Sequence, residues 1–472
     1  MSSLFAALGN AGNAMDVLEQ VMATVQNNVA NAQTPGYVTQ TLQINASMFD
    51  PTHGYSGGIL AGNIQSSRSL FAENSVWSAN EQLGSATQQS TSLQSLQQAF
   101  NVSGTSGIPA ALSQLYSAFS AWSASPSGAT AQQQVITAAQ NVAQAINSTA
   151  ASAQTVNSQA QQQTQSVVGQ INQLSSQIAS LNGQIESGNQ NDAGLEAQLY
   201  SNLESLSNLV NISAQPQSDG TVNVLLGGQV SLVSGTTATA ISAQNTSGGN
   251  ASNPPVQQIL SNGQDVTAKV QSGQLGGLLQ VTNTVIPSLL GSSSQQGSLN
   301  QLAQGLADRV NTLLTSGQTS SGAAGVPLFT YTAGAPTSVA QSLSVVSGIT
   351  GSQLAAVDPG PPSVSNGIAD ALAGLQNPSS AADMINGQSY TDFYSSIASN
   401  VGSLASSASS SQTTQTQVLA QAQNARAQVS GVSLNAQAAS LLQYQNAYQA
   451  SAEAFNTIRN TLSYLLQTLQ SA

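Results

Sequence analysis

Residues 27–40 read NNVANAQTPGYVTQ, and this stretch ends the first regular segment of the chain. Before it, apolar residues recur at alternating steps of four and three, the spacing of a heptad seam. Pro35 drives the residue before it away from helical backbone angles, and Pro-Gly favours a type II turn. The stretch therefore predicts a helix over residues 1–34 that stops sharply, with Tyr37 placed to anchor the chain after the turn.

Both ends of the chain carry such a seam. The N-terminal seam consists of Leu4, Leu8, Ala11, Met15, Leu18, Met22, Val25 and Val29. The C-terminal seam consists of Leu434, Leu441, Tyr444, Tyr448, Ser451, Phe455, Ile458, Leu462, Leu465 and Leu469. A stripe this narrow suits pairing with another helix, whereas a helix on a globular core usually buries a wider face. The alternative, two terminal helices packed on a globular core, stays open at this point.

The composition is unusual in its lack of charge. Only 5% of the 472 residues are charged, 40% are hydrophobic and the net charge is -12. The length allows two to four domains. The five basic residues are Arg68, Lys269, Arg309, Arg426 and Arg459. Because they form no cluster, the sequence argues against nucleic acid and anionic lipid as partners.

The sequence holds no cysteine, which excludes disulfides and thiol chemistry. The first positive charge is Arg68, so the basic start of a cleavable secretory signal is missing. No run of about 18 apolar residues exists to span a membrane. If the protein leaves the cell, we expect a route that cleaves no signal peptide.

The patterns together predict a mainly α fold with inserted β-rich domains. We expect an elongated, nested architecture in which the terminal helices pair like a coiled coil. The predicted parts are terminal helices (1–34 with 430–472), a connector (35–88), a helical domain (89–212 with 270–318 and 389–429) and a β-rich outer domain (213–269 with 319–388).

No catalytic set is convincing, so we predict neither an enzyme nor a cofactor. His53 is the single histidine, too few for a usual zinc site and without a nucleophile partner. Glu186, Asp192 and Glu196 raise a glycoside-hydrolase alternative, but around a polar turn their expected role is solvation and helix capping. No Asp-x-Asp-x-Asp run indicates a calcium loop.

The opening stretch resembles a signature of the axial proteins of the bacterial flagellum. The residues that carry it are Asn28, Ala30, Asn31, Thr34, Pro35, Gly36 and Tyr37. The C-terminal run SGVSLNAQAASLLQYQNAYQASA, residues 430–452, most resembles the hook-associated protein 1 (FlgK) family. That family usually has acidic residues in the first part of this run, and this chain has Asn435, Ala436 and Gln437 there.

Interior stretches resemble the same family in collinear order. Residues 171–212 resemble its long helical hairpin, and residues 219–235 resemble the strand pair that follows. Glu196-Ala197-Gln198-Leu199 stands where relatives have Asp-Gln-Arg-Asp, so the resemblance implies that an ion pair is lost here.

The resemblance implies a structural protein that forms a ring between flagellar hook and filament, outside the cell. The implied partners are further copies of the chain, the hook protein, the second hook–filament junction protein and a cytoplasmic export chaperone on the C-terminal helix. We expect assembly through the two seams, chiefly Leu4, Leu8, Met15, Leu18, Met22, Val25, Val29, Leu441, Tyr444, Tyr448, Phe455, Ile458, Leu462 and Leu465.

Two kinds of alternative remain at this stage. Within the flagellum, the chain could be hook protein, flagellin or the second junction protein, although these usually lack either Thr-Pro-Gly-Tyr or the helical hairpin. Outside it, a secreted adhesin could use the β-rich part as a binding face. Trp77 and Trp122, the two tryptophans, lie in expected helices, where we predict that they pack between elements instead of binding glycan.

Overall fold

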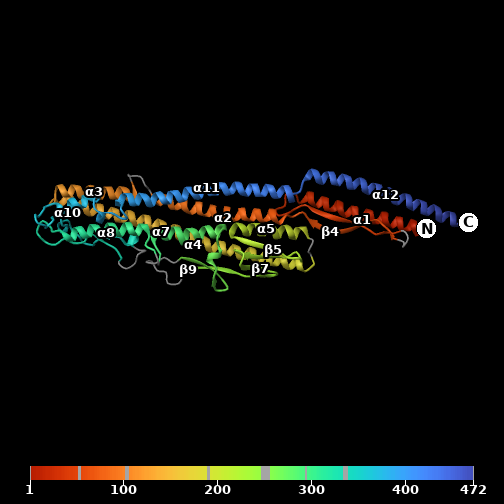
Figure 1. Ribbon diagram of the computed structural model, residues 1–472, viewed down its shortest axis with the longest axis horizontal. Coiled ribbons are helices and arrows are strands. Elements are labelled where there is room, and N and C mark those ends of the chain that lie inside the picture. The colour runs from red at the N-terminus through yellow and green to blue at the C-terminus, as the bar shows by residue number, and fades with distance from the viewer. Residues whose placement is uncertain are drawn as a thin grey trace. The chain divides into compact units, whose positions relative to one another are not determined.

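A computed structural model describes residues 2–50, 55–100, 106–188, 192–245, 256–292, 295–332 and 339–470. His53, the one histidine weighed above, lies outside the described residues. The chain divides into two compact units, and three long helices contribute residues to both (Figure 1). Unit 1 comprises residues 1–81, 171–240 and 416–472, and unit 2 comprises residues 82–170 and 241–415.

Unit 1 begins and ends with the terminal helices, α1 (Ser2–Ala30) and α12 (Leu434–Gln470). After α1, two short antiparallel ribbons follow, β1 with β4 and β2 with β3. Their bounds are Gln40–Ala46 (β1), Phe49–Asp50 (β2), Tyr55–Ser56 (β3) and Ile59–Ser66 (β4). The sequence predicts a helix over 1–34; α1 ends at Ala30 and residues 31–36 form turns, so the break before Pro35 is confirmed but the helix is four residues shorter than predicted.

The rest of unit 1 comes from the middle of the chain and from α11. Four antiparallel strands in the order β5-β6-β7-β8 form one sheet beside the helical hairpin. The elements are α2 (Leu70–Ala99, in part), α4 (Ala129–Glu186, in part), α5 (Ala193–Leu209), β5 (Ile212–Pro216), β6 (Val222–Leu226), β7 (Val230–Ser234), β8 (Thr237–Ala238) and α11 (Tyr390–Ser430, in part). The predicted hairpin over 171–212 and the strand pair over 219–235 are both present.

Unit 2 is a helical body with small β elements. Besides parts of α2, α4 and α11 it holds α3 (Gly107–Ala124), β9 (Ile241–Asn245), β10 (Gln257–Ser261), β11 (Gln264–Asp265), η1 (Thr267–Lys269), α6 (Gly273–Gln280), the π-helix η2 (Val281–Val285), α7 (Ile286–Leu290), α8 (Ser298–Ser316), β12 (Phe329–Thr330), α9 (Val339–Ser342), β13 (Ser344–Val345), η3 (Gly351–Gln353), α10 (Gly367–Gly374) and η4 (Ala381–Asp383). Its core gathers side chains from α3, α4, α8 and α10, including the fully buried Trp122. The indole N–H of Trp122 donates to the carbonyl of Pro126, so this tryptophan packs inside the unit as predicted.

Asparagines in helices form paired hydrogen bonds with the first residue of several strands. In each case the side-chain amide donates to the carbonyl and accepts from the N–H of one strand residue, at 2.8 to 3.0 Å. The pairs are Asn28 with Gln40 (β1), Asn182 with Val222 (β6), Asn283 with Gln257 (β10) and Asn311 with Phe329 (β12). Because a carboxamide has the donor and acceptor of a peptide group, it replaces a missing neighbouring strand.

The observed fold is mainly α with small inserted sheets, as the sequence predicts. Residues 319–388 hold less strand than expected: only β12, β13 and isolated bridges are found among the described residues there, beside α9 and α10. The two compact units divide residues 213–269 between them. The four-part domain division therefore stays a prediction.

Candidate assembly interface

The terminal helices α1 and α12 pack side by side in unit 1 (Figure 1). The Tyr448 hydroxyl donates to Glu19 Oε1 at 2.8 Å, and Asn28 Nδ2 donates to Gln437 Oε1 at 3.1 Å. Gly12 lies nearer the start of α1, and a Cβ added there would lie 3.9 Å from the ring of Phe455. Since later residues of α12 meet earlier residues of α1, the two helices are antiparallel.

The structure brings most of the predicted seam residues to this helix pair. On α12, Leu462 is buried, and Leu441, Tyr444, Tyr448, Phe455 and Ile458 are half-buried. On α1, Leu18 and Val25 are buried, and Leu4, Leu8, Met15 and Met22 are half-buried. Two predicted residues, Val29 (44% exposed) and Leu465 (36% exposed), face away from the packing within this chain.

Sequence reasoning missed part of the buried face of α1. Val17, Val21 and Asn28 are buried although they lie off the heptad seam. Val17 and Val21 form a row at steps of four with the seam residue Val25, and Asn28 follows three residues later; α1 also contacts the β1–β4 ribbon. A wider apolar face of this kind is typical of a helix with two neighbours, and the spacing of Val17, Val21 and Val25 was the available signal.

Asn28 is the centre of the signature stretch. Its Oδ1 accepts from the Tyr37 hydroxyl and from the Gln40 N–H, both at 2.9 Å, while its Nδ2 donates to Gln40 and Gln437. One buried amide thus joins the end of α1, the turn, the first residue of β1 and helix α12. Burial, with the nearby Glu196 carboxylate, raises the pKa of Tyr37, so its hydroxyl keeps the proton that it donates.

The turn itself has the predicted geometry. The Tyr37 N–H donates to the Thr34 carbonyl at 3.1 Å, and Gly36 has a φ of 75°. That angle fits the third position of a type II turn. A Cβ at Gly36 would lie 2.3 Å from the Ala197 carbonyl oxygen of α5, so glycine is required on two counts.

Below the turn lies an ion cluster that the sequence did not predict. Arg68 contacts Glu73 at 2.6 Å and Glu196 at 2.9 Å, and Arg426 contacts Glu73 at 3.2 Å and Glu204 at 2.7 Å. Glu196 thus forms an ion pair of its own with Arg68, and the loss of the ion pair that relatives form in this element stays a prediction. Asp192 does cap α5 as expected, accepting from the N–H groups of the second and third residues of the helix.

The cluster connects segments far apart in sequence. Glu73 is only 1% exposed and binds both arginines, and Arg68 also donates to the Gly36 carbonyl at 2.7 Å. The Arg68 guanidinium lies 3.8 Å from the Tyr200 ring centre, and that ring stacks on Trp77. Burial raises the pKa of Tyr200 to about 12 although Arg68 opposes the shift. Although the chain has few charged residues, it therefore forms ion pairs where segments far apart in sequence must be held in a fixed alignment.

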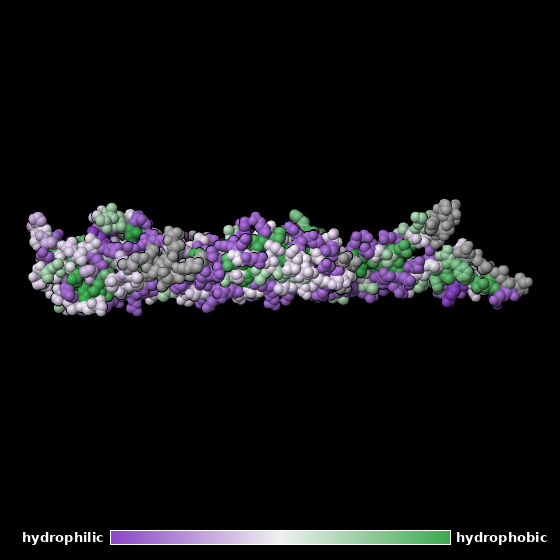
Figure 2. Space-filling view, turned by 90° about the horizontal axis from the view of Figure 1, so that it is seen from below, coloured by the Kyte–Doolittle hydropathy of each residue, from purple (hydrophilic) through white to green (hydrophobic). Residues whose placement is uncertain are grey.

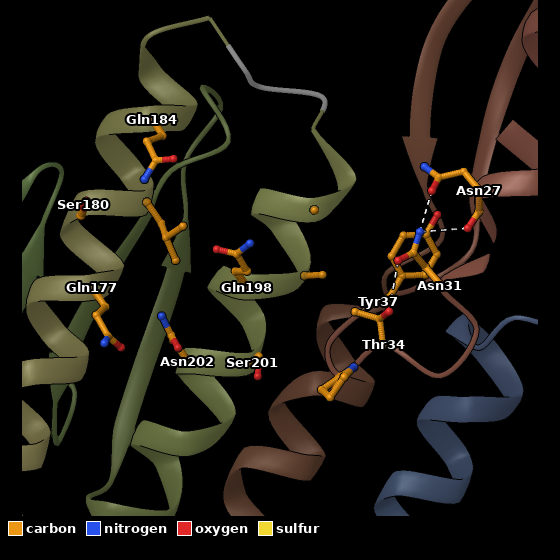
Figure 3. A pocket seen from close by; sticks show the side chains of 14 residues that line it. Asn27, Asn31, Thr34, Tyr37, Gln177, Ser180, Gln184, Gln198, Ser201 and Asn202 are labelled. Carbon is orange, nitrogen blue, oxygen red and sulfur yellow. Dashed lines mark hydrogen bonds between the residues drawn. The ribbon is translucent and has the colours of Figure 1, made fainter. Parts of the chain in front are cut away.

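A polar groove of about 800 Å³ lies between the turn and the helical hairpin (Figure 3). Asn27 and Asn31 lie on one side, and Gln177 and Gln198 lie on the other. Asn31 is itself held by Asn27 and Thr34, at 2.6 and 3.1 Å. The described residues of the lining carry amide and hydroxyl groups and no carboxylate or amine, so the groove offers uncharged hydrogen-bond donors and acceptors.

Unit 1 exposes many large apolar side chains, and green surface is visible on its terminal helices in Figure 2. Phe71, at the start of α2, is 83% exposed. The others in this unit are Phe5, Val29, Ile44, Met48, Phe49, Leu60, Ile64, Leu70, Val418, Val429, Leu434, Leu442, Tyr464, Leu465 and Leu466. Exposed apolar surface on this scale is typical of an interaction site.

The described residues hold no group of three or more histidine, cysteine or carboxylate side chains placed to bind a metal ion. Nor does any helix in the described part of the chain combine the length and apolar character needed to cross a bilayer.

Comparisons with known proteins agree with this picture. The flagellar hook-associated protein FlgK helical domain, as a family model, matches residues 93–329, just over half of the chain. Flagellar hook-associated protein 1 of Bacillus subtilis (strain 168) is 25% identical over 156 residues, which are 31% of this chain and 31% of that relative.

A solved structure is similar over a longer stretch. The flagellar hook junction protein FlgK from Burkholderia pseudomallei matches with a TM-score of 0.65 at 17% sequence identity. The match covers 75% of this chain and 99% of that chain, and it shows a shared fold. With the family model matched over half of its residues, this chain belongs to the family of the flagellar hook-associated protein FlgK.

Proposed function

We propose that the chain is a structural subunit of the bacterial flagellum that forms a ring at the junction between hook and filament. Family membership and the shared fold with a hook junction protein support this role. The observation that carries the proposal is the exposed apolar surface of unit 1, centred on the paired terminal helices. A subunit that remained alone would leave this surface in water.

In this account the mechanism is assembly. Each copy contributes an α1–α12 pair whose inner seam is closed within the chain, as the hydrogen bond from Tyr448 to Glu19 illustrates. The outer faces of the pair, with side chains such as Leu442 and Tyr464, then pack against neighbouring copies. Burying each large apolar side chain contributes roughly 1.5–3 kcal/mol, so a few per interface suffice. No chemical step is assigned to the protein.

The proposed partners follow from the same surface. We propose contacts with the hook protein on one side of the ring and with the second junction protein on the other. Before assembly, a cytoplasmic export chaperone would cover α12, whose exposed side chains such as Leu465 and Leu466 favour association in water. We further propose that the protein reaches the outside of the cell without cleavage of a signal peptide.

Removal of the gene from the source bacterium tests this role. We expect cells that build hooks, lack attached filaments and release filament protein into the medium. Expression of the intact chain should restore filaments, whereas a chain that lacks residues 434–470 should not. Normal filaments on cells without the gene would contradict the proposal.

A further inference from the structure

Among the described residues, all arginines but one form ion pairs with carboxylates of the same chain. Arg68, Arg309 and Arg426 each bind a carboxylate of the same chain at 2.6 to 3.2 Å. Arg459, on α12, is exposed and forms no ion pair within the described part of the chain. The protein has few basic residues, and its other arginines pair within the chain. An exposed arginine on the helix that is proposed to assemble is therefore expected to pair with a group outside the chain.

The same helix pair carries acidic side chains that also lack a basic partner among the described residues. Asp16 and Glu19 are exposed on α1, and Glu453 is exposed on α12. We call these three residues the acidic patch. Glu19 accepts the hydrogen bond from Tyr448, and Glu19 and Asp16 together help to raise the pKa of that tyrosine, so they lie close to each other.

The antiparallel register separates Arg459 from this patch. The pairings of Glu19 with Tyr448 and of Gly12 with Phe455 place Asp16 at the level of Ser451. Arg459 lies eight residues farther along α12, about 12 Å at 1.5 Å per residue. The charges on one copy are thus complementary but too far apart to pair with each other.

The position of Arg459 favours a lateral contact. Arg459 directly follows Ile458, a seam residue, so it lies at the flank of the helix pair. Flanking positions of this kind hold the ion pairs that set partner and register between neighbouring helices. Leu466 lies seven residues after Arg459, so it falls on the same side of α12, and it is 44% exposed, which gives the flank an apolar component.

Resting on the proposed ring, we propose that the occupant of this flank is a second copy of the chain. Arg459 of one copy pairs with the acidic patch of its neighbour and sets the axial offset between adjacent copies. The unpaired charges and the exposed Leu466 are then buried in one contact. The interface is heterologous, because the arginine of one copy meets a different surface, the acidic patch, of the next copy.

A cysteine cross-linking experiment tests the pairing directly, since the natural chain contains no cysteine. The variant Asp16→Cys with Arg459→Cys is expressed in the bacterium in place of the natural chain, and its flagellar junctions are oxidised. Within one copy the two positions are about 12 Å apart, beyond the roughly 7 Å limit for a disulfide. A ladder of dimers, trimers and larger species is therefore expected only from neighbouring copies.

The matched control is Asp16→Cys with Gln443→Cys. Gln443 lies eight residues before Ser451, as far from the level of Asp16 as Arg459 but in the opposite direction. This control should give no ladder. If junctions form, a ladder from the control alone would overturn the pairing. The absence of a ladder from both variants would do the same. Either result would leave the proposed ring intact.

Charge reversal provides a second readout. Arg459→Glu should reduce the number of assembled junctions by about tenfold or more, and Gln443→Glu should not. Adding Asp16→Arg and Glu453→Arg to Arg459→Glu should restore assembly, with Glu19 kept because it holds Tyr448. Unchanged assembly of Arg459→Glu would refute the pairing, whereas failure of the natural chain to form junctions would refute the ring and the pairing together.

Discussion

The side chain of Asn182 forms two hydrogen bonds with the main chain of Val222. The Val222 N–H donates to Asn182 Oδ1 at 3.0 Å, and Asn182 Nδ2 donates to the Val222 carbonyl at 2.9 Å. The same Nδ2 also reaches the Gly235 carbonyl at 2.7 Å. A single fully buried amide thus holds the first residue of β6 and the turn after β7 against helix α4.

Replacing Asn182 by alanine should destabilise unit 1 strongly. The change leaves the buried main-chain groups of Val222 and the Gly235 carbonyl with fewer partners, and each unsatisfied group costs about 1–3 kcal/mol. We expect the free energy of unfolding to fall by about 3 kcal/mol or more. Urea unfolding checks this, with Asn446→Ala on the exposed face of α12 as the control. Equal, small losses for both variants would contradict the role of the clamp.

Gly36→Ala should disrupt the turn of the signature stretch. Its φ of 75° is unfavourable for alanine, and the new Cβ would overlap the Ala197 carbonyl oxygen. Gly348→Ala is the matched control, since Gly348 has a φ of 77° and nothing within 4 Å of a Cβ. The control should lose only the conformational cost of about 1–2 kcal/mol, and Gly36→Ala should lose clearly more. Similar losses by thermal unfolding would show that the close approach does not matter.

Glu73→Gln tests the ion cluster. The substitution removes the carboxylate that both Arg68 and Arg426 contact, and breaking a buried pair typically costs about 3–5 kcal/mol. Asp383→Asn, which breaks the more exposed pair with Arg309, should cost less. A double-mutant cycle of Glu73→Gln with Arg426→Gln should reveal coupling between the two sites. Additive losses would mean that the pair is not energetically coupled.

Alkaline pH should weaken unit 1 through Tyr200. Its pKa in the fold is about 12, above the value of about 10 in the unfolded chain. A raised pKa gives stability that is complete below pH 10 and is lost as pH rises towards 12. Between pH 8 and pH 11 the free energy of unfolding of the natural chain should fall by about 1.4 kcal/mol more than that of Tyr200→Phe. Chemical denaturation at both pH values measures this, and parallel pH profiles for the two proteins would contradict the assignment.

Phe455→Glu should prevent assembly without unfolding unit 2. The charge would enter the seam between α12 and α1, where the ring faces Gly12. Ser406→Glu adds the same charge to an exposed position of α11 in unit 2 and should assemble normally. Electron microscopy counts the junctions, and circular dichroism checks that the remaining helices are intact. Leu18→Glu should behave like Phe455→Glu, and junctions built from either variant would refute the role of the seam.

The sequence predicted what depends on local periodicity and turn chemistry. The seam from Leu441 to Leu462, the break of the first helix before Pro35 and the cap at Asp192 follow from neighbouring residues, and the structure has all three. The ion cluster could not be predicted, because Arg68 and Glu196 are 128 positions apart and meet only after α5 packs beside the turn. The asparagine clamps were missed for the same reason, since Asn182 gives no local signal for Val222.

Antibody-gold electron microscopy of flagella sheared from the source bacterium tests the central claim most directly. The account predicts label confined to the band between hook and filament. Label along the whole hook or filament would keep a flagellar role but contradict a junction ring. Label elsewhere on the cell surface, with bare flagella, would contradict the account as a whole.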